Sequence, residues 1–333
     1  MQHFRKIIFT HFHYMTYLCR IKNVIMENIE QYIIGQANKV LGTTNTTIVK
    51  RLEGGMSNYT YVIQADGNKY TYRVPGKFAE KFVDRDIEKA NIDKVDSLGL
   101  NNKTTYFDIA SGEKMAEYIE GTILSDTDIS SYDTISAKAL KLLHESNLKF
   151  QDYDAFGRLD QYEQYCRELN HVHPDAYKQL RHDLDALHTT YADIPQVPCH
   201  CDYQPTNLVL SGDKLYVFDW EYAGMNDPFY DIACYGNAGI DKALSLFEAY
   251  LGHTPTKAEL SRLYFWRTFQ CLQWYNVAIF KDITGLGKEL NIDFMGVANM
   301  FVRMAQQLIE LAQNDTNTSK VESLNIYGNS TAN

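Results

Sequence analysis

Polar residues between positions 200 and 219 have the types and the spacing of a site that could handle phosphate. His200, Asp202 and Asn207 precede a predicted hairpin of two short apolar strands joined by a Gly-containing turn, over 208–218. Asp219 comes directly after the second strand. Because a hairpin brings the open ends of its two strands together, we expect Asn207 and Asp219 to lie side by side.

This set of side chains suits the transfer of a phosphoryl group to a hydroxyl. Such a transfer depends on positioning and on charge neutralisation more than on covalent chemistry. Mg²⁺ takes oxygen ligands, so Asn207 and Asp219 are the predicted metal ligands. Asp202 is the predicted base that orients the attacking hydroxyl and accepts its proton. His200 is a candidate catalytic residue, and the alternative is a hydrogen-bonding histidine that shapes the loop.

The first third of the chain offers residues that could bind ATP. Arg73 lies on a predicted strand and could reach the phosphates, with Glu88 on the next helix as its partner; for both, the alternative is a surface charge. A Gly-Gly turn before Asn58 could place backbone N–H groups over phosphate. The junction at 117–121 could bind adenine or be a mere linker. The predicted nucleotide-binding residues are Gly55, Ser57, Asn58, Arg73, Glu88, Glu117, Tyr118 and Ile119.

Apolar periodicity divides the chain into a sheet-rich first part and a helical second part. Strands are expected at 47–52, 59–65, 69–74, 104–109 and 113–119. Helices are expected at 27–41, 80–98, 131–146, 158–190, 241–251, 256–281 and 293–313. We therefore predict an α+β fold with two lobes, an antiparallel sheet lobe at 26–121 and a larger, mainly helical lobe at 122–313. The polar tail at 314–333 is expected to be flexible.

Composition limits the partners. The formal net charge of −10 argues against nucleic acid and anionic membrane, and no apolar run reaches the roughly 20 residues that span a bilayer. The six cysteines show no regular framework, which indicates reduced thiols and a cytoplasmic protein. Cys199-His200-Cys201 lacks the two-residue gaps that zinc sites favour. Met26 reads as a natural start, so residues 1–25 are expected to be a non-native or disordered extension.

Together these motifs resemble the choline kinase group of the aminoglycoside phosphotransferase-like, protein-kinase-like fold, particularly its bacterial members. The resemblance covers about residues 50–235, and the stretches that carry it are 54–58, 70–76, 117–121, 143–144, 200–207 and 219–222. It implies ATP and Mg²⁺ as cofactors, with Asp202 as base and Arg73 on phosphate. It also implies that Gln204 lies near the substrate hydroxyl and that Asp231 is structural.

The same resemblance implies choline as the acceptor. Aromatic faces hold a quaternary ammonium best, with an acid nearby. The predicted substrate residues are Gln204, Glu221, Tyr222, Trp266 and Trp274, and Tyr235 and Tyr275 are further candidates for an aromatic cage. For each tryptophan, core packing is the alternative.

Two departures from the group concern the substrate and not the phosphoryl transfer. The stretch 234–239 holds no acid, where the group often carries a Glu, and Cys271 stands three residues before Trp274, where the group often has a Trp. The alternatives are another small-molecule kinase, such as an aminoglycoside phosphotransferase, and a non-catalytic nucleotide-binding scaffold. The sequence does not choose between choline and ethanolamine.

Overall fold

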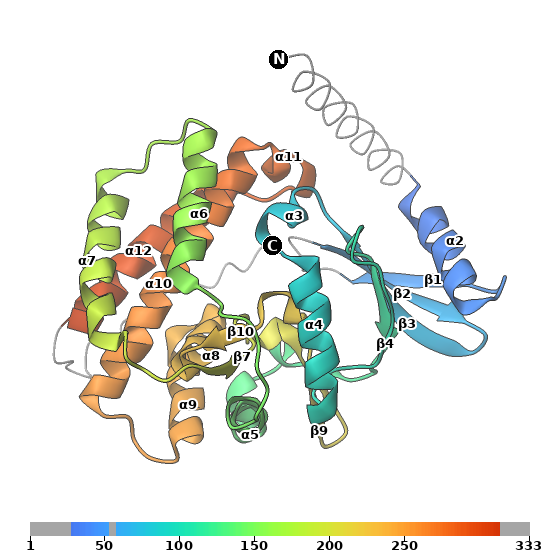
Figure 1. Ribbon diagram of the computed structural model, residues 1–333, viewed down its shortest axis with the longest axis horizontal. Helices are drawn as coiled ribbons and strands as arrows, with labels where there is room; N and C mark the ends of the chain where they lie inside the picture. The colour runs from blue at the N-terminus through green and yellow to red at the C-terminus, as the bar shows by residue number, and fades with distance from the viewer. Residues whose placement is uncertain (1–27, 53–57, 314–333) are drawn as a thin grey trace. The chain divides into compact units, whose positions relative to one another are not determined.

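The computed structural model describes residues 28–52 and 58–313, and these form two compact units (Figure 1). The first unit contains the described residues up to Arg85 together with Asn102–Tyr118, and the second contains Asp86–Asn101 and the chain from Ile119 onward. The predicted extension at 1–25 and the predicted tail at 314–333 lie outside the described residues.

The first unit is built on a five-stranded antiparallel sheet with the order β1-β2-β3-β5-β4. Its turn at Asp66-Gly67 has positive φ at both positions, which is the backbone of a tight two-residue hairpin. Ile33 and Ala37 of α2 are fully buried in one core with residues of the sheet. The elements are α2 (Ile29–Leu41), β1 (Thr47–Leu52), β2 (Asn58–Ala65), β3 (Asn68–Pro75), α3 (Ala79–Phe82), β4 (Thr104–Phe107) and β5 (Lys114–Glu117).

The second unit is mainly helical and contains two small sheets. Strands β6 (Thr122–Ile123), β8 (Leu208–Ser211) and β9 (Lys214–Val217) form one sheet, and β7 (Val197–Cys199) pairs with β10 (Gly224–Asn226). The helices are α4 (Arg85–Val95), α5 (Asp133–His144), α6 (Ala155–Glu168), α7 (Asp175–Tyr191), α8 (Pro228–Tyr235), α9 (Ile240–Leu251), α10 (Lys257–Ile283), α11 (Leu286–Leu290) and α12 (Phe294–Gln313).

Helix α10 is the centre of this unit, because almost all of its side chains from Leu263 to Lys281 are buried. It packs against α12, α8, α6 and α7, and Figure 1 shows it among them. Thr256 begins the helix with a capping box, in which Thr256 and Glu259 bond to each other's backbone N–H. No helix in the described ranges is both long and apolar enough to cross a membrane.

Two helical predictions differ from the structure in their boundaries. The stretch 158–190 is two helices, α6 and α7, because the chain turns at Asn170, where φ is 62°, and Pro174 precedes α7. The stretch 80–98 is likewise interrupted, at Val83 and Asp84 between α3 and α4. Helix α4 groups with the second unit, although the predicted boundary at 121 places it in the first.

Candidate active site

The predicted hairpin is present and follows His200–Asn207, which we name the catalytic loop after its predicted role. This loop lies between β7 and β8, and Asp219 follows β9 by one residue. Phe218 donates its backbone N–H to the carbonyl of Asn207 at 2.8 Å, which closes the open end of the hairpin. Asn207 and Asp219 therefore flank the same end of one ladder, as the spacing predicted.

Asp202 is buried and bound by two neutral amides of its own loop. The Asn207 Nδ2 donates to its Oδ2 at 3.0 Å, and the Gln204 Nε2 lies 3.1 Å from both carboxylate oxygens. Burial raises the pKa of Asp202 well above its usual range, the charges of Asp219 and Glu221 act in the same direction, and the two amide bonds oppose them. Asp202 thus lies within electrostatic reach of two further acids.

Those two acids meet a third one, Glu88. Carboxylate oxygens of Glu88, Asp219 and Glu221 lie within 4.8 Å of one another, and Glu88 is fully buried. The Asn207 amide nitrogen donates to Asp202, so the amide oxygen is the atom of this side chain that could bind a cation. Carboxylate and amide oxygens are the ligands that Mg²⁺ prefers, so these residues fit that ion.

Helix α4 brings Glu88 into this group. Glu88, Asn91, Ile92 and Val95 form its buried face, and the Asn91 Nδ2 donates to the carbonyl of Ala223 at 2.6 Å, just after Glu221 and Tyr222. From the sequence we expected Glu88 to be the ion-pair partner of Arg73. Its position beside Asp219 was not predicted. The signal was available, because an acid on the apolar face of a helix needs a buried partner.

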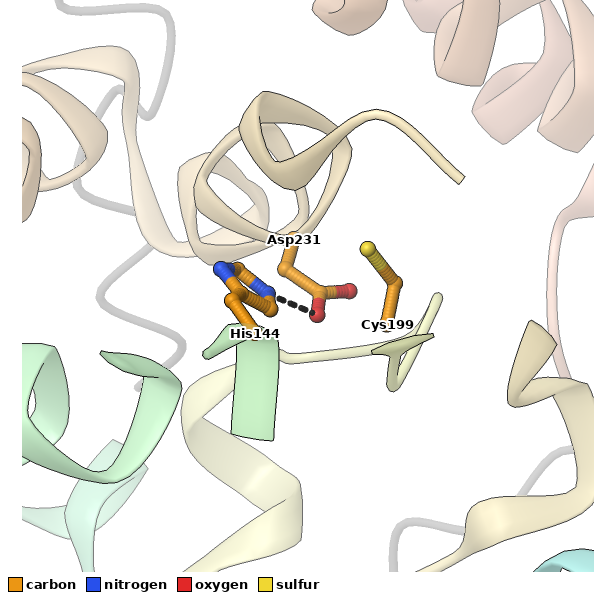
Figure 2. A group of neighbouring side chains, drawn as sticks. All are labelled: His144, Cys199 and Asp231. Carbon is orange, nitrogen blue, oxygen red and sulfur yellow. Dashed lines mark hydrogen bonds and ion pairs between the residues drawn. The ribbon is translucent and has the colours of Figure 1, made fainter. Parts of the chain in front are cut away.

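Another buried carboxylate, Asp231 of α8, holds the catalytic loop, and Figure 2 shows its bond to His144. Its Oδ2 accepts the backbone N–H of His200 at 2.8 Å and the His144 Nε2–H at 3.0 Å, and its Oδ1 accepts the backbone N–H of Cys201 at 2.6 Å. Cys199 lies beside this group, and its thiol faces the carbonyls of Asn226 and Asp227. Because both Asp231 oxygens are engaged by donors, we interpret the cluster as structural.

His200 has its two ring nitrogens engaged inside the loop. The Nε2 donates to the carbonyl of Phe218 at 2.8 Å, and the Nδ1 accepts the backbone N–H of Asp202 at 3.2 Å. This geometry favours the loop-shaping role over direct chemistry. The thiol of Cys201 accepts a bond from the Asn226 amide.

Two residues of the site adopt a backbone conformation that side chains other than glycine rarely take. Cys201, which precedes Asp202, has φ 61°, and Asp219 has φ 65°. Each such residue costs on the order of 1–3 kcal/mol and persists only when its surroundings hold it. For Cys201, the hydrogen bond from its backbone N–H to the Asp231 carboxylate stabilises this conformation.

Two of the predicted substrate residues meet in the second unit. The rings of Tyr222 and Trp274 contact each other edge to face, with centroids 6.4 Å apart. Lys281, two turns after Trp274 on α10, is buried. Burial lowers the pKa of Lys281 to about 8, and the charge of Glu221 acts in the opposite direction. Lys281 was not among the predicted site residues, although a lysine in an apolar helix is a visible signal.

Other candidate aromatics have different neighbours. Trp266 packs among Tyr230, Phe265 and Phe269, which is the core-packing alternative. Tyr235 stacks on Tyr203, and Tyr275 packs on Tyr177 and bonds through its hydroxyl to His171.

The predicted nucleotide residues of the first unit occupy its sheet. Arg73 of β3 is buried, and its Nη2 donates to the carbonyl of Gly112 at 3.0 Å. Asn58 opens β2 opposite Pro75. Glu117 ends β5, where its N–H donates to the carbonyl of Lys103 and its carbonyl accepts from Asn102.

Tyr118 is the last residue of the first unit, and its N–H donates to the carbonyl of Lys69. Ile119 belongs to the second unit. Gly55 and Ser57 lie outside the described residues. The nucleotide roles of all these residues stay predictions, as does the pairing of Arg73 with Glu88.

Residues 48–266 match the phosphotransferase enzyme family. The matched range covers the sheet, the catalytic loop and most of the helical part. The chain belongs to this family. Among similar proteins, the LicA protein of Haemophilus influenzae is 30% identical over 188 residues, or 54% of this chain. Because the match covers 55% of LicA, the chain spans about half the length of that relative.

Similar solved structures extend the likeness over most of the chain. The choline kinase LicA from Streptococcus pneumoniae is 26% identical, with a TM-score of 0.71 over 85% of this chain and 99% of that one. A LicA structure in complex with AMP has the same TM-score of 0.71 at 24% identity, over 85% of this chain and 98% of that one, and shows the fold. The predicted α+β, kinase-like fold and the resemblance to the choline kinase group are confirmed.

Replacing Asp231 with Asn tests its role in holding the loop His200–Asn207. An amide keeps one acceptor oxygen and places a donor against a backbone N–H, so the three buried charge-assisted bonds to His200, Cys201 and His144 weaken or are lost. We expect the free energy of unfolding to fall by about 3 kcal/mol, measured by urea denaturation. The matched control is Asp213→Asn in the exposed hairpin turn, expected within about 0.5 kcal/mol of the parent. Equal stability of both variants would refute the anchoring role.

The pKa of Lys281 predicts a pH dependence of stability. Its folded pKa of about 8 lies below the ordinary value of 10.5, so the unfolded chain binds more protons between these values. The stability of the parent should therefore rise with pH relative to Lys281→Met, by up to about 1.4 kcal/mol per pH unit between pH 8 and 10. The measurement is urea denaturation of both proteins across that range, and parallel curves would contradict the assignment.

Proposed function

We propose that this protein transfers the γ-phosphate of ATP to the hydroxyl of a small amino alcohol, with choline as the first candidate. One observation carries the proposal: Asp202, Asn207 and Asp219 converge from a single loop and hairpin. This is the arrangement of base and metal ligands that phosphoryl transfer needs. Membership of the phosphotransferase family supports the reaction class, and a relative solved with AMP supports an adenine nucleotide.

Each residue then has a defined task. Asp202 accepts the proton of the attacking hydroxyl, and the amides of Gln204 and Asn207 hold its carboxylate in place. Asn207 and Asp219 would hold Mg²⁺, with Glu88 and Glu221 beside them. When bound, Mg²⁺ supplies positive charge to the phosphate oxygens. Use of ATP also leads us to propose a cytoplasmic location.

The aromatic pair supports a cationic acceptor. A quaternary ammonium cannot donate a hydrogen bond and is held by the faces of Trp and Tyr with an acid nearby. Tyr222 and Trp274 supply the rings, and Glu221 supplies the acid. Choline kinase is also what the solved LicA of S. pneumoniae is called.

The alternatives fit less well. An aminoglycoside carries several ammonium groups and would need acids on the helices that face it. Helix α10 instead buries two cations, Arg267 and Lys281, among aromatic residues. A non-catalytic scaffold would have no reason to keep Asp202, Asn207 and Asp219 together.

A panel of acceptors tests the reaction. ATP consumption with Mg²⁺ is measured for choline, ethanolamine, thiamine, homoserine and kanamycin, and we expect choline to give the highest kcat/KM. Asp202→Asn keeps the shape of the base and removes its basicity, so kcat should fall by about 10²- to 10⁴-fold. Circular dichroism checks that the variant is folded. A variant with near-normal turnover would exclude Asp202 as the base.

Substitution of Trp274 tests the acceptor site. Trp274→Ala removes a cation–π contact, so we expect KM for choline to rise by roughly 2- to 30-fold while KM for ATP stays within about twofold. Trp274→Phe keeps an aromatic face and should recover much of the loss. Equal changes in both KM values would point to packing instead of substrate binding.

A further inference from the structure

A row of three polar side chains ends on the base. Asn237 donates its Nδ2 to the Oε1 of Gln204 at 3.1 Å. Gln204 in turn directs its Nε2 to both carboxylate oxygens of Asp202 at 3.1 Å. Asn237 lies in the short 3₁₀ turn Gly236–Ala238 between α8 and α9. Its amide thus reaches Gln204 from another part of the second unit.

When Asp202 is ionised, as a base must be, the row has one direction. An ionised carboxylate accepts hydrogen bonds and donates none, so the NH₂ end of the Gln204 amide must face Asp202. The oxygen of that amide then faces Asn237 and requires a donor. If the Gln204 amide were reversed, its oxygen would meet the carboxylate and repel it. With its NH₂ turned to that oxygen, Asn237 stabilises the orientation of Gln204 that supports the base.

We propose that Asn237 is a positioning residue, which acts on the reaction by holding the Gln204 amide in the orientation that donates to Asp202. The proposal rests on the function proposed above, in which Asp202 is the base. Gln204 and Asn207 then clamp the carboxylate between two amides. The acceptor hydroxyl meets a base whose direction is already set, and such preorganisation acts mainly on kcat.

The turn that carries Asn237 is itself held in place by α10. Gly236 packs against Arg267, since a Cβ at Gly236 would lie 3.4 Å from the Cδ of Arg267. Arg267 is fully buried and donates to the Oε1 of Gln270 at 3.2 Å, and the Nε2 of Gln270 donates to the carbonyl of Tyr230 in α8 at 2.9 Å. The position of Asn237 is therefore set by packed neighbours, as a positioning role requires.

The decisive experiment is a double-mutant cycle on kcat. We expect Asn237→Ala to lower kcat about tenfold, as for the loss of one hydrogen bond, with KM for ATP within about twofold of the parent. If Asn237 acts only through Gln204, the double variant Gln204→Ala/Asn237→Ala loses no more than Gln204→Ala alone. Losses that multiply would overturn the proposal.

Variants at position 237 separate positioning from packing. Asn237→Asp has the same shape but only accepts, so it draws the Gln204 NH₂ away from Asp202 and should lower kcat at least as much as Asn237→Ala. Asn237→His keeps a ring N–H donor and should recover part of the rate. Normal kcat in the Asp variant would rule out the orienting bond. Gln164→Ala, on the exposed face of α6, is the control and should leave kcat unchanged.

The same variants distinguish this proposal from the proposed function. If the parent phosphorylates one of the acceptors and the kcat losses of the two single variants multiply in the double variant, only the proposed role of Asn237 is wrong. If the parent phosphorylates no acceptor, the proposed function fails, and the cycle is repeated on the free energy of unfolding. A non-additive effect of the two substitutions on stability would then support the hydrogen bond between Asn237 and Gln204. Additive effects would show that the two side chains do not interact.

Discussion

The buried carboxylate of Asp231 is the interaction on which the rest of the site depends. Its two oxygens take the backbone N–H groups of His200 and Cys201 and the ring of His144, so one side chain of α8 joins the catalytic loop to α5. Buried backbone donors are costly when they have no acceptor. The left-handed conformation of Cys201, which aims the next residue, Asp202, is maintained by this bond.

Around the acids, this protein uses neutral amides as donors. Asn207 and Gln204 bind Asp202, Asn237 binds Gln204, and Asn91 holds the chain just after Glu221. Amides position carboxylates without cancelling their charge. The group of Glu88, Asp219 and Glu221 brings three carboxylates together, and carboxylate oxygens are ligands that a divalent ion prefers.

The parts of the site that are close in sequence could be predicted, and those assembled by packing could not. The hairpin follows from alternating apolar residues and a Gly turn, so the meeting of Asn207 with Asp219 was foreseeable. Glu88 reaches Asp219 because α4 docks through Asn91 onto Ala223, a contact across 132 positions. Such pairings depend on which helix faces pack together. Apolar periodicity predicts which face of a helix is buried, but it does not predict what that face packs against.

Lys281 and Asn237 were overlooked for a related reason. Their types are ordinary, and their meaning comes from Glu221 and Gln204, which other elements deliver. The role of His200 could be read from its own motif. Its two ring nitrogens bond to Phe218 and Asp202, which lie in the adjoining hairpin and in the same loop.

Helix α4 makes the second unit discontinuous, because Asp86–Asn101 is contributed from within the sequence of the first unit. Dissection of the chain at residue 121 would give an N-terminal fragment that carries the helix with its buried face exposed to solvent, and a C-terminal fragment that lacks one of three acids. Neither piece would be an autonomous lobe. The two fragments are therefore best studied mixed together, in a complementation experiment. The N-terminal fragment then supplies α4 to the helical unit of the C-terminal fragment.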